Sequence, residues 1–92
     1  ISCSLDGRGC NLLKKPGGSV TEIGKIVVEI IVDKDGNVIS AKVTHKGTTI
    51  TDKAMQDMAV EAAKGTRFTP ATATQPEIQM GTITYEYIDK KS

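Results

Sequence analysis

Aromatic, thiol and imidazole side chains are scarce in this sequence. Its 92 residues include no Trp, one His and two Cys, and the only aromatic residues are Phe68, Tyr85 and Tyr87. Ile, Val, Ala and Met must therefore supply most of any hydrophobic core. Two cysteines and one distant histidine are also too few for a zinc site. No apolar run approaches the roughly 20 residues that a membrane-spanning helix needs.

The chain also lacks an excess of charge of either sign. Its 12 Lys and Arg residues and 11 Asp and Glu residues are mixed along the sequence and leave a net charge of +1. A nucleic-acid partner is not indicated, because it would require a basic stripe. The carboxylates are scattered, no phosphate-binding loop is present, and His45 has no Cys or Ser nucleophile near it in the sequence. We therefore expect a non-catalytic single domain without metal or cofactor.

The segment 24–43 predicts a β-hairpin. Two runs rich in β-branched residues flank the turn Lys34-Asp35-Gly36-Asn37, and turns of this kind between apolar runs favour hairpins. The first run, residues 24–33, is largely apolar on both faces, which is typical of a central strand with neighbours on both sides. In the second strand, Val38–His45, we expect Ile39, Ala41 and Val43 to point inward.

A helix and one more strand follow. We expect Thr51 or Asp52 to cap a helix over Asp52–Lys64, and Gly65 to end it. Adjacent apolar pairs recur every four residues and predict an apolar stripe along one face of this helix; its members are Ala54, Met55, Met58, Ala59, Ala62 and Ala63. Of these we expect Met55, Met58, Ala59 and Ala62 to be buried against the sheet. The last strand, Ile78–Ile88, alternates, with Ile83, Tyr85 and Tyr87 on one face.

The order strand, strand, helix, strand predicts an α+β fold. A helix between the second and third strands makes these two parallel, and the least strained arrangement places the first strand between them. The expected architecture is a three-stranded antiparallel sheet of order 2-1-3, with one main helix packed on one face. The third strand then lies at an edge, where unpaired main-chain groups can bind an extended segment.

The remaining residues, 1–23, are expected to form an irregular N-terminal arm, with residues 24–92 as the domain proper. Pro16-Gly17-Gly18 interrupts regular structure, and a short strand around Asn11–Lys14 fits the arm. The chain has an even number of cysteines, and the two, Cys3 and Cys10, lie close together in the sequence. This pattern suits a structural disulfide in an oxidising compartment; two free thiols are the alternative. Because the sequence starts at Ile1, we expect any anchor or targeting signal to lie outside it.

The segment from Gly24 to Ile88 resembles the C-terminal domain of TonB-family energy transducers. The resemblance rests on an ordered set of segments: G-K-I-V-V-E-I-I-V-D-K-D-G-N-V-I-S-A-K-V, D-K-A-M-Q-D-M-A-V-E-A-A, K-G-T-R-F-T-P-A and Q-M-G-T-I-T-Y-E-Y. The family shows the same succession of a glycine-opened strand, a D-x-x-G turn, a helix, an aromatic-x-P-A element and a closing strand. A Tyr-Pro pair before the first strand and a Trp at the helix end, common in the family, are absent here.

The resemblance implies a periplasmic interaction domain whose full-length protein is anchored in the inner membrane and linked to proton-driven motor proteins. Such domains bind the TonB box of outer-membrane transporters by strand addition and transmit force for active uptake of nutrients such as siderophores. The resemblance assigns the peptide-binding edge to the closing strand, at Thr82, Ile83, Thr84, Tyr85, Glu86 and Tyr87. The alternative is a self-associating periplasmic scaffold domain, since an exposed edge can also pair with its own copy into a homodimer.

Overall fold

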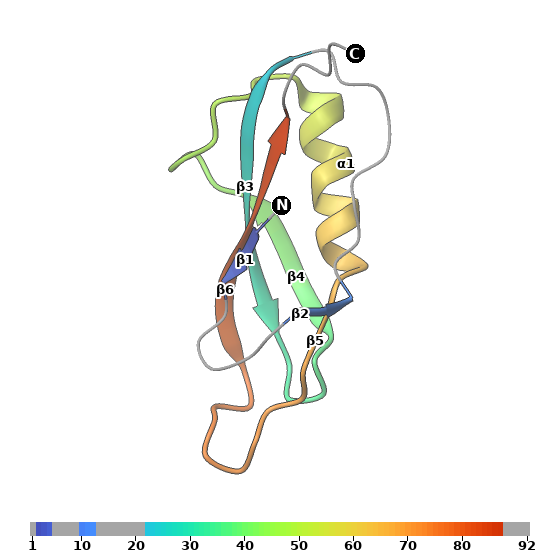
Figure 1. Ribbon diagram of the computed structural model, residues 1–92, viewed down its shortest axis with the longest axis vertical. Coiled ribbons are helices and arrows are strands. Elements are labelled where there is room, and N and C mark those ends of the chain that lie inside the picture. The colour runs from blue at the N-terminus through green and yellow to red at the C-terminus, as the bar shows by residue number, and fades with distance from the viewer. Residues whose placement is uncertain (1, 5–9, 13–21, 88–92) are drawn as a thin grey trace.

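The computed structural model describes residues 2–4, 10–12 and 22–87; for residues 2–4 and 10–12 it describes the backbone alone. An antiparallel sheet is built from three longer strands, β3 (Gly24–Val32), β4 (Val38–Val43) and β6 (Gln79–Tyr87). β3 lies between the other two (Figure 1). The predicted order of these three strands and the α+β class are therefore confirmed.

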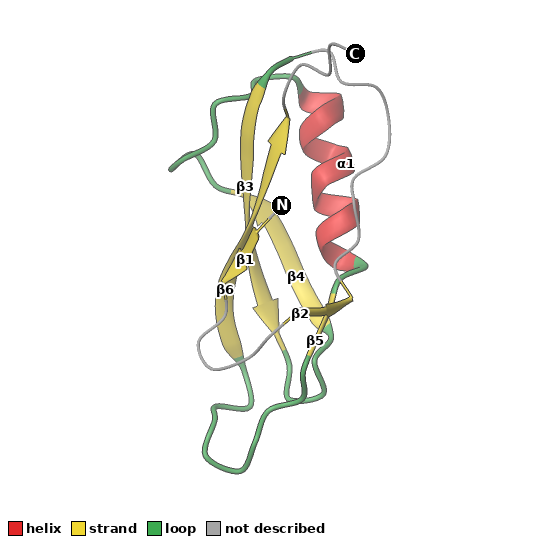
Figure 2. Cartoon of the chain, in the orientation of Figure 1, coloured by secondary structure: helices red, strands yellow, loops and turns green. Residues whose placement is uncertain are grey.

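Three further elements complete the fold. The helix α1 (Lys53–Lys64) packs against β3 and β4 (Figure 2). A short strand, β1 (Ser2–Ser4), pairs with β6, so that the sheet has four strands in the order β1-β6-β3-β4. A separate two-stranded sheet joins β2 (Cys10–Leu12) to β5 (Arg67–Phe68). β2 overlaps the short strand expected around Asn11–Lys14.

The core lies between the sheet and α1. From β3 it takes the four side chains that the alternation places on one face, each with none of its surface exposed: Ile26, Val28, Ile30 and Val32. β6 contributes Ile83 and Tyr85, and two residues outside the long elements, Ile50 and Phe68, fill its ends. The small side chains on the buried side of α1, Ala59, Ala62 and Ala63, leave room for the helix to lie close to the sheet.

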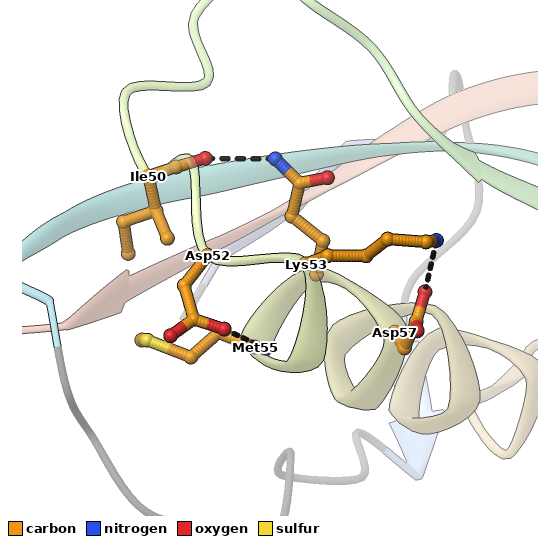
Figure 3. Close-up of polar contacts among 6 residues, drawn as sticks. Ile50, Asp52, Lys53, Met55 and Asp57 are labelled. Carbon is orange, nitrogen blue, oxygen red and sulfur yellow. Dashed lines mark hydrogen bonds and ion pairs between the residues drawn. The ribbon is translucent and has the colours of Figure 1, made fainter.

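The start of α1 is fixed by several polar contacts. The Asp52 carboxylate accepts a hydrogen bond from the Met55 backbone N–H at 3.1 Å, which makes Asp52 the N-cap (Figure 3). The Gln56 side-chain amide donates to the Ile50 carbonyl oxygen at 2.8 Å. Glu22 accepts from the backbone N–H groups of Thr51 and Asp52, at 3.0 Å and 2.9 Å. A carboxylate at this end of the helix also interacts favourably with the helix dipole.

Two predicted core positions are wrong. Ile39 is 55% exposed, because a β-bulge shifts the register of β4: Ile31 pairs with Ser40, whereas Val32 pairs with Val38. The extra residue breaks the inward and outward alternation, so Val38, Ala41 and Val43 pack on the core and Ile39 does not. Met58 is 38% exposed, because the buried line of α1 runs through Met55, Ala59, Ala62 and Ala63 and leaves Met58 at its flank.

Candidate functional site

The candidate site is the outer edge of β6. This strand is nine residues long and pairs with β3 without a bulge, from Gly24 opposite Tyr87 to Val32 opposite Gln79. Its alternation buries Ile83 and Tyr85 in the core and leaves Glu86 and Met80 exposed on the other face of the sheet. Thr82 and Thr84 share this second face and are partly buried. The β-branched threonines favour the extended conformation that the edge requires.

The pairing of β3 shows which main-chain groups of β6 face outward. The carbonyl oxygens of Lys25 and Val27 accept hydrogen bonds from the backbone N–H groups of Thr49 and Thr44, both at 2.9 Å, on the β4 side. Main-chain groups of successive residues point to opposite sides of a strand, so the even-numbered residues of β3 face β6. These residues pair with the odd-numbered residues of β6. The outward main-chain groups of β6 therefore belong to Met80, Thr82, Thr84 and Glu86.

The expectation that this edge is free is wrong for part of its length. β1 pairs antiparallel with β6, with Ser2 opposite Thr84, Cys3 opposite Ile83 and Ser4 opposite Thr82 (Figure 1). The arm carries no periodicity that would have predicted this strand, since a strand of three residues is too short to show one. The edge is thus occupied at Thr82 and Thr84, and Met80 and Glu86 lie beyond the residues that β1 pairs with.

The structure separates the six predicted site residues by role. Ile83 and Tyr85 are 0% and 1% exposed, so their side chains belong to the core and cannot contact a partner. The main-chain groups point outward at Thr82, Thr84 and Glu86. At Tyr87 the main-chain groups point toward β3, and the side chain packs against the core. Sequence reasoning missed Met80, which is 64% exposed; its place in the β6 alternation was the available signal. The predicted disulfide concerns the side chains of Cys3 and Cys10, which lie outside what the structure describes.

Burial also governs the two tyrosines of β6. Removal from water raises the pKa of Tyr85 to about 12, although the Thr66 hydroxyl acts in the opposite direction. Burial raises the pKa of Tyr87 as well. Both phenols are therefore neutral around pH 7, and neither offers a charge to a partner at the edge.

A shallow hollow lies at the end of the site, where β6 ends and β3 begins. It has a volume of about 340 Å³ and is lined by Ile23, Gly24, Lys25, Thr49, Glu86 and Tyr87. Ile23 is 63% exposed and supplies apolar surface, and the carboxylate of Glu86 and the ammonium of Lys25 provide both signs of charge. The hollow adjoins Glu86 and Tyr87, at the end of β6 that lies beyond the residues paired with β1.

The other edge of the sheet, along β4, is less suited to strand addition. Its bulge at Ile39 interrupts the regular spacing of main-chain groups. Lys42 is exposed on β4 and lies 3.6 Å from the Glu29 carboxylate on β3. Charged side chains and bulges at edge strands both discourage pairing with another chain. The regular outer edge of β6 is therefore the better acceptor of the two.

Other classes of site find no support among the residues that the structure describes. Within these residues, no group of three or more His, Cys, Asp and Glu side chains is placed to hold a metal ion. Over the same part of the chain, no helix is long and apolar enough to span a bilayer. Comparison of this chain with protein-family models, with curated proteins and with solved structures finds no match.

Proposed function

We propose that this protein is a non-catalytic interaction domain that binds an extended peptide along the outer edge of β6. The observation that carries the proposal is β1, a strand remote in sequence that is itself added to this edge. Its pairing supports the view that the outward groups of Thr82 and Thr84 accept an extended segment. Strand addition of this kind draws its affinity from main-chain hydrogen bonds.

The resemblance to TonB-family C-terminal domains suggests the partner. On this proposal the peptide is the TonB box of an outer-membrane transporter, the domain lies in the periplasm, and the full-length protein is anchored in the inner membrane beside its motor proteins. The sheet suits the transmission of force, since β6 pairs with the central strand β3 over nine residue pairs. A pull along a peptide added to β6 would load these hydrogen bonds together, in shear, rather than one after another.

The register selects the variant that tests this function. The Thr84 N–H points outward, whereas the Tyr85 N–H points to β3 and is needed for the fold. Thr84→Pro therefore removes a donor from the edge and leaves the β3–β6 pairing intact. Thr84→Val is the matched control, because it keeps the N–H and loses only the hydroxyl.

Affinity for synthetic TonB-box peptides, measured by fluorescence anisotropy, should fall at least about tenfold in Thr84→Pro and stay within about twofold in Thr84→Val, as expected where main-chain bonds dominate. Equal affinity of the two variants would argue against binding at this edge. Sedimentation over a range of concentrations separates the alternative, a self-associating scaffold domain. A constant dimer that binds none of the peptides would favour the scaffold.

A further inference from the structure

We propose that β1 is a built-in competitor that occupies the peptide-binding edge until a longer strand displaces it. This inference rests on the proposed function and names the regulation of the same site. β1 contributes three residues, and among the strands that the structure describes it pairs with β6 alone. By the alternation of main-chain groups, only Ser2 and Ser4 can exchange hydrogen bonds with Thr84 and Thr82.

Such a short strand is weakly held. The net gain from a few main-chain hydrogen bonds is comparable with the conformational entropy lost when three residues are ordered. The nine-residue pairing of β6 with β3, in contrast, is backed by buried side chains such as Ile83 and Tyr85. We therefore expect β1 to leave the edge by local opening while the β3–β6 pairing stays intact.

A longer peptide can make contacts that β1 does not make. The residues that β1 pairs with end at Thr84, so the outward groups of Glu86 and Met80 remain beyond it on either side. A peptide that spans Met80 to Glu86 uses four outward residues instead of two, and its end reaches the hollow beside Ile23 and Tyr87. The length of a peptide therefore determines whether it can displace β1 from the edge. A peptide as short as β1 makes no more contacts than β1 does and should not displace it.

Hydrogen exchange of the full chain tests the opening of β1 without any peptide. In reducing buffer, the amides of Thr82 and Thr84, which face β1, should exchange at least about tenfold faster than those of Ile83 and Tyr85, which face β3. Ser4→Pro removes a donor of β1 and should speed exchange at Thr82 and Thr84 further, whereas Ser4→Ala should not. Equally slow exchange at all four amides would make β1 a permanent strand and overturn the proposal.

Peptide affinity tests the competition itself. If β1 occupies the edge about nine-tenths of the time, releasing it should improve the affinity of Ser4→Pro for a synthetic TonB-box peptide about tenfold relative to the parent and to Ser4→Ala. Binding to all three proteins with equal affinity would overturn the competition and leave the proposed function standing. Binding to none of them, Ser4→Pro included, would overturn the proposed function, since the vacated edge then takes no peptide.

Discussion

The turn of the β3–β4 hairpin offers the sharpest test of the packing at the end of the sheet, through the substitution Gly36→Ala. Gly36 has φ of +93°, and a Cβ atom there would overlap the Phe68 carbonyl oxygen and lie 3.0 Å from the Phe68 carbonyl carbon. The Gly36 carbonyl oxygen also accepts a hydrogen bond from the Phe68 N–H at 2.9 Å. Phe68 is 2% exposed, so it cannot move aside without disturbing the core.

Two costs should add in this variant. The positive φ is unfavourable for alanine by about 1–2 kcal/mol, and the displaced Phe68 contact should cost about 1–2 kcal/mol more through the lost hydrogen bond and poorer packing. Gly47→Ala is a matched control, because φ is +87° there but the new Cβ would meet only the Val27 side chain, at 3.1 Å. Gly47→Ala should therefore carry the backbone cost alone, about 1–2 kcal/mol.

Urea denaturation followed by circular dichroism gives both free energies of unfolding. We expect Gly36→Ala to lose more stability than Gly47→Ala, by about 1–2 kcal/mol. Equal losses would mean that only the backbone conformation matters, and would refute the close approach of the turn to Phe68.

Three further predictions concern the helix and the core. Ala59→Asp should cost several kcal/mol because it buries an unpaired charge, whereas Met58→Asp should cost less than about 1 kcal/mol at its exposed position; similar melting temperatures would contradict this helix orientation. Glu22→Gln should lower the free energy of unfolding by about 1 kcal/mol, since the carboxylate at the start of α1 loses its charge, and an unchanged urea midpoint would speak against that contact. Burial raises the pKa of Tyr85 to about 12 in the folded protein, so the unfolded chain ionises first and the free energy of unfolding should fall as the pH rises from about 10 toward 12; alkaline unfolding that is no less steep in Tyr85→Phe would contradict it.

The main elements could be predicted because their sequence patterns are long. β3 has nine residues with apolar side chains on both faces, and α1 has an N-cap, an apolar stripe and a terminal glycine. These signals are local, and the crossover rule then fixes the order of the three long strands. The cap at Asp52, expected from its side-chain oxygen, is confirmed by its contact with Met55.

The predictions that were wrong all concern features that depend on contacts between elements distant in the sequence. The bulge at Ile39 depends on how β4 meets β3, and alternation within β4 alone does not reveal it. The exposure of Met58 depends on which line of the apolar stripe packs on the sheet. β1 is too short for any periodicity, so its pairing with β6 emerges only in the folded chain. The sequence therefore predicted β6 as the candidate edge without predicting that part of it is occupied.

The central claim, that a partner strand adds to the outer edge of β6, is tested most directly by amide protection in a complex. Isotope-labelled protein would be saturated with a synthetic TonB-box peptide, and hydrogen exchange would be followed residue by residue. The account predicts that the amides of Met80 and Glu86, which lie beyond the residues that β1 pairs with, become protected, and that protection at Thr82 and Thr84 increases as the peptide replaces β1. Protection that appears instead at the outward amides of β4, Ala41 and Val43, would contradict it.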